Sequence, residues 1–388
     1  MQNPKGCWLQ CTVAALAFFC ALGLNVNAFS VYMPYLVELL ELTPNQSSGF
    51  LLIRGLLSAA AVYLARYYYE KLEIRLGYTL VLVMSAAALA IYACASGFAG
   101  LCIAAAISGI SCGLGSMYPV AILIHRWFPR HEGLAMGICA SSSGLAITVG
   151  APILTHIIET RSMLVAMYAE LGFMVLCAAV CLLLLRNRPD GVPHFTAKVK
   201  EVRHPLRLNT LFFAIVGLGV MGEAVAFITV HYSFEQFDPY LIASVVAVAG
   251  ALLIGAKFLL GQLLDVWGGH RTNRLFFAAA IAGCLLFCLG SVAGTIPAFA
   301  AASLYGVGLS VQTVGISVYA RDLSRPEDYE ATQQQFQFAS LLGAPVCTLF
   351  AGQTATFTGN YRCFFLIVAG VTVFSAVVIQ RAYRRVRR

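Results

Sequence analysis

The stretch that decides the fold reads Gly261-Gln-Leu-Leu-Asp265-Val-Trp-Gly268-Gly-His-Arg271, and it separates two apolar runs at residues 239–264 and 274–293. Glycines at both ends of such a stretch allow two helices to approach closely and the chain to turn tightly between them. Asp265 is placed to cap the following helix and to pair with a basic residue nearby. We therefore expect a short, closely packed connection between two long apolar helices.

The composition requires that much of the protein faces lipid. The 388 residues are 60% hydrophobic and 11% charged, and the mean hydropathy is +0.81. Soluble domains carry about 25% charged residues and roughly 45–50% apolar ones. Apolar runs of roughly 20 residues, long enough to cross a hydrocarbon core of ~30 Å, recur along the whole chain. We therefore predict a multi-pass protein of the lipid bilayer.

The apolar runs predict an all-α membrane protein with twelve transmembrane helices. Backbone polar groups must find partners inside their own segment in lipid, so each span should be helical. The alternating strands of an outer-membrane barrel are absent from the pattern. The first run continues to about Leu36 without a small-residue cleavage site, which favours a helix over a signal peptide. The expected spans are residues 9–36, 48–66, 78–95, 98–124, 133–158, 163–187, 208–232, 239–264, 274–293, 296–320, 332–356 and 361–382.

The basic residues predict the orientation of the chain in the cell inner (plasma) membrane. Lys and Arg gather in cytoplasmic loops. With the N-terminus inside, most of the 25 basic residues fall in cytoplasmic segments, and only Arg161 and Arg362 fall outside the cell. Arg54 and Lys257 lie within spans. Both termini are therefore expected to be cytoplasmic. Because the charge of +8 is spread over short gaps, we do not expect nucleic-acid binding.

The longest gap between spans, residues 188–207, divides the chain into two equal halves. It is polar and basic and contains Pro189, Pro193 and Pro205, which is typical of a linker. We expect a six-helix half at 1–187, a cytoplasmic linker at 188–207 and a six-helix half at 208–388. Such a division is typical of transporters built from two repeats.

The quoted stretch resembles the G-x-L-x-D-x-x-G-x-x-R loop of the major facilitator superfamily, and it lies in the matching loop of a twelve-span chain. The resemblance implies the major facilitator fold, with Gly261, Asp265, Gly268 and Arg271 controlling the conformation of the transporter. In the loop after the second span, Leu72, Arg75 and Gly77 fit the same pattern. The aspartate position of that copy then falls on Ile74, with Glu73 beside it.

Spans four and five resemble the monocarboxylate porter and oxalate/formate antiporter branch of this superfamily. Glycine-rich sequence at Gly109, Gly113 and Gly115 leads to Trp127-Phe128, a basic loop and Gly133-Leu-Ala-Met-Gly137. Helix packing alone also accounts for glycines of this spacing.

Lys257 is the leading candidate for a substrate contact. It precedes Gly261 by four residues, where the branch carries a substrate-binding arginine, so the resemblance implies contact with an anion. A lysine with a purely structural role is the alternative. The chain departs from the branch in two ways: Leu253 stands where the porters carry a coupling aspartate, and no Lys or Arg lies between Phe336 and Phe357.

Charged residues within membrane spans are costly and usually functional. Arg54 and Glu223 both lie in the outer part of their spans, so they are expected either to pair at an external gate or, for Arg54, to form a second anion contact. Arg54 could also pair with Glu38 within its own half. Glu170 is expected to make a structural hydrogen bond. Polar and aromatic candidates for the substrate site, with interhelical hydrogen bonding as the alternative, are Asn25, Asn27, Tyr32, Tyr118 and Gln312.

The leading hypothesis is a secondary active transporter that moves a small organic anion, a carboxylate, by alternating access, with a proton or a counter-anion as a coupled partner. The alternative is an efflux antiporter for drug-like or cationic molecules with Glu223 as its acidic site. An integral-membrane enzyme is less favoured, since no nucleophile–base, metal-ligand or phosphate-loop spacing occurs. A membrane sensor is less favoured as well, since no signalling domain is expected from the pattern. We expect no cofactor or metal and a monomer. The 13 cysteines are interpreted as small packing residues.

Overall fold

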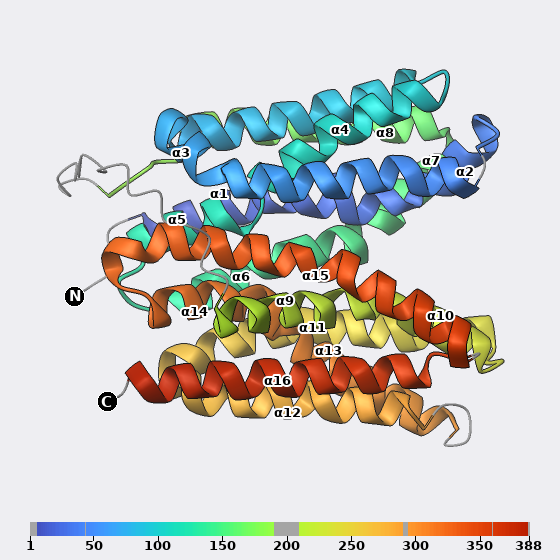
Figure 1. Ribbon diagram of the computed structural model, residues 1–388. Helices are drawn as coiled ribbons and strands as arrows, with labels where there is room; N and C mark the ends of the chain where they lie inside the picture. The colour runs from blue at the N-terminus through green and yellow to red at the C-terminus, as the bar shows by residue number, and fades with distance from the viewer. Residues whose placement is uncertain (1–5, 43, 190–208, 290–293, 359, 387–388) are drawn as a thin grey trace. The chain divides into compact units, whose positions relative to one another are not determined.

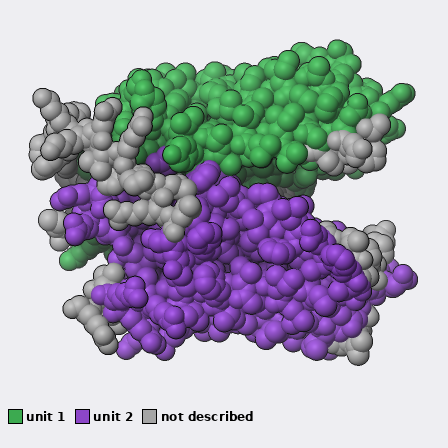
Figure 2. Space-filling view, in the orientation of Figure 1, with its two compact units in different colours: residues 1–195 green, residues 196–388 purple. Residues whose placement is uncertain are grey.

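The computed structural model describes residues 6–42, 44–189, 209–289, 294–358 and 360–386. Helices and short connections make up these residues, with no strand among them. The chain forms two compact units, residues 1–195 and 196–388, which Figure 2 distinguishes by colour. The expected linker falls mostly on residues 190–208, outside the described residues.

Unit 1 contains six membrane-length helical segments, several of them made of more than one helix (Figure 1). Along the chain they are α1 (Cys7–Phe18) with η1 (Phe19–Asn27), η2 (Ala28–Val31) and α2 (Met33–Leu39), then α3 (Pro44–Cys94), which contains two segments, α4 (Phe98–Leu114) with α5 (Met117–Trp127), α6 (Glu132–Leu145) with η3 (Ala146–Gly150) and α7 (Ala151–Thr160), and α8 (Met163–Leu184).

Unit 2 has six segments as well, and α12 and α16 lie side by side along it (Figure 1). In order they are α9 (Thr210–Glu223) with η4 (Ala224–Ala226) and α10 (Phe227–Phe234), α11 (Pro239–Trp267), α12 (Gly269–Phe287), α13 (Thr295–Ser310) with η6 (Val311–Gly315) and α14 (Ile316–Leu323), α15 (Tyr329–Thr358) after the turn η7 (Pro326–Asp328), and α16 (Arg362–Val386).

The predicted all-α membrane fold is confirmed, and each of the twelve expected spans falls on a helix. Nine helical segments of the described residues are long and apolar enough to cross a membrane, and one of them, Gly49–Cys94, is twice the usual length and breaks at Glu73. The two remaining spans fall on α12, whose expected end reaches the undescribed residues 290–293, and on α15, whose first turns are polar. Large apolar side chains on the outside of α8, such as Leu176 and Leu183, are well exposed, as a lipid-facing surface requires.

Several spans are interrupted by wider or tighter helical turns. Wide π-helical turns form η1, η3 and η6, and a tight 3-10 turn forms η4 directly after Glu223. Such turns often mark functional positions in helices, because they redirect side chains and free backbone groups. Asn25 and Asn27 lie in η1 and Gln312 in η6, whereas Tyr32 directly follows η2 and Glu223 directly precedes η4. Five of the predicted residues therefore lie in or beside an interruption.

Glycines set the closest helix contacts, as the sequence predicts for Gly109 and Gly113. A Cβ on Gly109 would come within 2.3 Å of the Arg54 carbonyl oxygen, so the second and fourth spans touch backbone to backbone. In unit 2, a Cβ on Gly343 would come within 2.4 Å of the Gly219 carbonyl carbon, which brings α9 and α15 equally close. These contacts fix the helices that carry Arg54 and Glu223.

Candidate functional site

The quoted loop turns at Gly268, whose backbone has φ 75° and ψ 160°, a conformation open to glycine but strained for other residues. The helix α11 ends one residue before it, and α12 begins one residue after it. The Thr272 hydroxyl donates a hydrogen bond of 3.0 Å to the Leu263 carbonyl across the turn. Gly269 lies against the Tyr383 ring, since a Cβ there would come within 2.4 Å of the ring carbon that bears the hydroxyl. The loop is therefore held tightly against α16.

Asp265 makes the expected pairing with a basic residue, and the partner is Arg321 on α14. A guanidinium nitrogen of Arg321 lies 3.8 Å from Asp265 Oδ1. Arg321 Nε also donates to Asp322 at 2.8 Å, and the Tyr383 hydroxyl donates to the other Asp322 oxygen at 2.9 Å. These bonds connect α11, α14 and α16 at one end of unit 2. The expected cap of the next helix is wrong, because Gly268 occupies the N-cap position of α12 and no side chain caps it. Arg271 is exposed.

The corresponding loop of unit 1 turns at Glu73, with φ 56° and ψ 162°, nearly the conformation of Gly268. Matching these two residues places Glu70 where Asp265 stands in the second copy. Glu70 accepts a hydrogen bond of 2.8 Å from Arg66 Nε. The register that assigned the aspartate position to Ile74 is therefore wrong. That alignment relied on identical residues, and it failed because the residue at the turn is Glu73 and not a glycine.

Glu73 and Arg75 fasten this loop to the end of α8. The Asn187 amide donates to the Glu73 carboxylate, and the Asn187 amide oxygen accepts from the Arg75 backbone N–H at 2.8 Å. Arg75 Nε donates to the Leu182 carbonyl at 2.6 Å. The first copy of the motif thus connects neighbouring spans although its glycine is missing.

Lys257 lies on the buried face of α11. It is 4% exposed and shares that face with Leu260 and Leu264, whereas Phe258 and Leu259 are exposed on the lipid side. The helical spacing therefore points the lysine toward protein, not toward lipid. A cation at this position fits a contact with an anion better than a surface role does.

Arg54 packs against an aromatic ring of its own unit. Its guanidinium carbon lies 5.5 Å from the centroid of the Phe29 ring, a cation–π contact. Arg54 Nη1 is buried, and no group of the described residues forms a hydrogen bond with it. Arg54 is partly exposed, and Glu38 is exposed without any ion pair to it among the described residues, so the expected alternative pairing with Glu38 is not observed.

Glu223 and Gln312 lie near one another in unit 2. Glu223 ends α9 and is exposed. A Cβ on the preceding Gly222 would come within 2.8 Å of the Gln312 side-chain amide carbon, so α9 and η6 touch there. The Gln312 amide donates to the Ser340 hydroxyl at 3.3 Å. Arg54 and Glu223 belong to different units, and their pairing stays a prediction.

The remaining polar candidates of unit 1 make hydrogen bonds between helices. The Tyr32 hydroxyl donates to Glu170 at 2.7 Å, and both side chains are buried, which confirms the structural hydrogen bond expected for Glu170. The Asn27 amide donates to the Ser143 carbonyl at 3.3 Å. Asn25 bonds with Ser108 and Ser111, so the interhelical role considered for it is observed. Tyr118 is buried, with its ring 6.2 Å from that of Tyr69.

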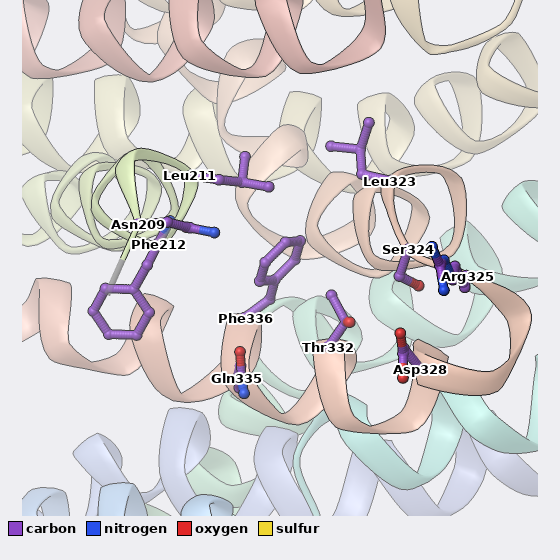
Figure 3. Close-up of a pocket in the computed structure, with 10 residues that line it drawn as sticks. All are labelled: Asn209, Leu211, Phe212, Leu323, Ser324, Arg325, Asp328, Thr332, Gln335 and Phe336. Atoms are coloured by element: carbon purple, nitrogen blue, oxygen red, sulfur yellow. The ribbon is translucent and has the colours of Figure 1, made fainter. Parts of the chain in front are cut away.

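A cavity of about 380 Å³ lies in unit 2 between the start of α9 and the connection from α14 to α15. Figure 3 shows Phe336 beside Asn209 and Thr332, with Ser324, Arg325 and Asp328 at the other side. None of the residues predicted to contact substrate lines this cavity. Among the described residues, no group of three His, Cys, Asp or Glu side chains could hold a metal ion.

Sequence reasoning missed the residues that surround the predicted ones. Phe29 and Tyr92 lie in apolar runs, and Arg321 lies in an ordinary basic loop, so nothing in their local sequence distinguished them. Their roles come from helix rotation and packing, which bring residues of separate spans together.

Comparison with known proteins decides the family. Residues 13–344 match the model of the Major Facilitator Superfamily. The chain belongs to the Major Facilitator Superfamily. This membership places it among membrane transporters and not among enzymes. The resemblance to the monocarboxylate and oxalate/formate branch stays an expectation.

Similar structures and a similar sequence accompany that match. A variant of the E. coli fucose:proton symporter FucP is similar with a TM-score of 0.77 and 14% identity, over 97% of this chain and 99% of that one. The human organic anion transporter MFSD10 is similar with a TM-score of 0.73 and 15% identity, over 98% and 100%. An uncharacterized 38 kDa protein of Thermoproteus tenax is 29% identical over 182 residues, and the match spans 46% of either chain.

Proposed function

We propose that this chain is a secondary active transporter of a small organic anion, a carboxylate, with Lys257 as the principal cation of its substrate site. The observation that carries the proposal is the burial of Lys257 on the inward face of α11, one turn before Gly261. A lysine in a membrane span is costly, and an anionic substrate supplies a reason for it.

Transport in this proposal proceeds by alternating access of the two six-helix halves, with a proton or a counter-anion as the coupled partner. The protein works as a monomer in the plasma membrane with both termini in the cytoplasm. The similar solved structures include a sugar:proton symporter and an organic anion transporter, so this fold serves both substrate classes. The choice of an anion therefore rests on Lys257 and Arg54.

The test is transport into proteoliposomes, after a thermal-shift screen of the purified protein against small carboxylates. Lys257→Gln should reduce anion transport at least about tenfold, the effect of losing one charge-assisted contact of ~1.4 kcal/mol or more. Lys257→Arg should keep part of the activity, because the charge remains while its shape changes. Lys71→Gln is the matched control, since Lys71 lies over the exposed Tyr67 ring, 4.4 Å from its centroid, outside the proposed site.

The second candidate function is efflux of cationic or drug-like molecules, and the exposed carboxylate of Glu223 at the end of α9 favours it. Substrate charge separates the two. If only cations bind and Glu223→Gln abolishes their transport, or if Lys257→Gln carries anions at the normal rate, the efflux function replaces the anion function.

A further inference from the structure

Two polar groups of unit 1 are buried without a hydrogen-bond partner among the described residues. One is Arg54 Nη1, and the other is the hydroxyl of Tyr92, a residue that is 2% exposed. A buried donor left without a partner costs roughly 1–3 kcal/mol, and a charged one costs more. Two such groups in residues that pack against one ring, Phe29, form a site that a ligand with hydrogen-bond acceptors can satisfy.

Both residues lie against the same aromatic ring, that of Phe29. The Arg54 guanidinium lies over the Phe29 ring, and that ring is 4.5 Å from the Tyr92 ring, centroid to centroid. Phe50, one helical turn before Arg54, lies 6.3 Å from Tyr92. The first span through η2 and both arms of α3 therefore converge on this point. The site is therefore built from packed helices of unit 1.

A ligand that satisfies these groups should carry negative charge. A guanidinium stays protonated in proteins, so Arg54 keeps its charge at every accessible pH. Glu170, a buried carboxylate of unit 1, accepts its hydrogen bond from Tyr32, and the described residues supply no carboxylate in an ion pair with Arg54. The Phe29 ring stabilises the cation through its face, but it carries no negative charge to balance it.

The donors also limit which anion fits. The site offers an N–H of the guanidinium and one hydroxyl, and the rings of Phe29 and Phe50 lie against Tyr92. A carboxylate can accept both hydrogen bonds with its two oxygens. Phosphate and sulfate carry more oxygens that would be left without donors, and a sugar would need acceptors as well.

We propose that Arg54 and Tyr92 form a subsite for the carboxylate group of a monocarboxylate, with Arg54 Nη1 and the Tyr92 hydroxyl as donors and Phe29 as the wall that excludes water. The proposal rests on the proposed anion transport and narrows its substrate class. Tyr92 is a binding residue that the sequence pattern did not single out.

The experiment measures benzoate and acetate binding to the purified full-length protein by calorimetry, with benzamide and inorganic phosphate as the comparison ligands. Wild type should bind a monocarboxylate and neither comparison ligand. Tyr92→Phe should raise its Kd about tenfold, the loss of one hydrogen bond to a charged group. Tyr168→Phe is the control, because it removes an exposed hydroxyl from α8.

Thermal unfolding without ligand separates binding from a structural role. Because the Tyr92 hydroxyl is buried without a partner, Tyr92→Phe should leave the Tm of the free protein equal or higher while it reduces the stabilisation by benzoate. A lower Tm with an unchanged Kd would mean that water or another group satisfies the hydroxyl, and it would overturn the subsite.

The variant Lys257→Gln distinguishes failure of the subsite from failure of the function. If Tyr92→Phe and Arg54→Gln bind the monocarboxylate as tightly as wild type while Lys257→Gln loses it, the subsite is wrong and anion transport stands. If wild type binds no monocarboxylate but transports a dicarboxylate through Lys257, the substrate class is wrong. If no anion binds at all, both proposals fail.

Discussion

At the scale of single residues, Glu73 and Gly268 show that two different residue types can adopt the same backbone conformation. Both residues turn the chain with positive φ and extended ψ between consecutive spans. Glycine reaches this region without strain, whereas other residues need surrounding contacts to hold them there. For Glu73 the contact is the Asn187 amide at the end of α8.

The first prediction concerns this strain. Glu73→Gly should raise the Tm, because relief of a conformation that costs ~1–3 kcal/mol outweighs the loss of one exposed hydrogen bond. Thermal unfolding of the detergent-solubilised protein measures it. Glu70→Gly is the control, since the same change in regular helix should destabilise by roughly 1 kcal/mol. A lower Tm for Glu73→Gly would mean that the Asn187 contact dominates.

Single residues also show the limit of sequence reasoning about the site. The cost of burying charge identified Arg54, Lys257, Glu170 and Glu223 from the sequence, since each lies in an apolar run. Their neighbours were not predictable, because they depend on how each helix rotates about its axis. Tyr32 was considered both for contact with substrate and for a hydrogen bond between helices, and its hydroxyl donates to Glu170.

At the scale of elements, the two inter-span loops perform the same task with different contacts. In unit 2, the helices α11, α14 and α16 are connected through Asp265, Arg321, Asp322 and Tyr383. In unit 1, the loop within α3 is connected to the end of α8 through Asn187. The spans were predictable from apolar length, whereas the π-helical interruptions were not, because neighbouring helices decide where a helix widens.

The second prediction belongs to the unit 2 loop. Asp265→Asn should slow transport by roughly twofold to fivefold, the range expected when a partly exposed ion pair of ~0.4–1 kcal/mol biases a conformational equilibrium. Folded protein should still accumulate, since Arg321 keeps its bond to Asp322. Initial rates in proteoliposomes measure it. Asp238→Asn is the control, because Asp238 Oδ1 accepts a hydrogen bond of 3.3 Å from the Leu241 N–H at the start of α11, and an amide oxygen can accept it as well. Equal rates for both variants would mean that Asp265 has no part in transport.

At the scale of the whole molecule, the apolar runs and basic loops predict an even number of spans, with both ends of the chain on one side. Reporter fusions test the third prediction directly. Fusions after Asn45 and Phe237 should report the external side, and fusions after Pro193 and Arg388 the cytoplasm. A fusion after Arg388 that reports the external side would contradict the orientation and the expected cytoplasmic linker together.

The last prediction concerns the two halves and the charges that each carries in the outer part of a span. If Arg54 and Glu223 pair when the external gate closes, an arriving carboxylate must replace Glu223 at the guanidinium, so gate and substrate compete for one cation. Each single variant, Arg54→Gln or Glu223→Gln, leaves one charge without its partner when the gate closes. The double variant should therefore weaken gate closure by less than the sum of the two single effects. Accessibility of cysteines introduced on the external side measures the effect.

A pair of known geometry calibrates that measurement. Arg362 donates to Glu235 through Nε at 2.6 Å and through a second nitrogen at 2.7 Å, within unit 2. The same double-variant cycle on Arg362→Gln and Glu235→Gln should give a clear coupling in thermal stability. Additive effects for Arg54 and Glu223, beside such a coupling for Arg362 and Glu235, would exclude the gate pair. Arg54 would then bind only the carboxylate of the substrate, because the neighbouring Tyr92 is neutral and cannot balance its charge.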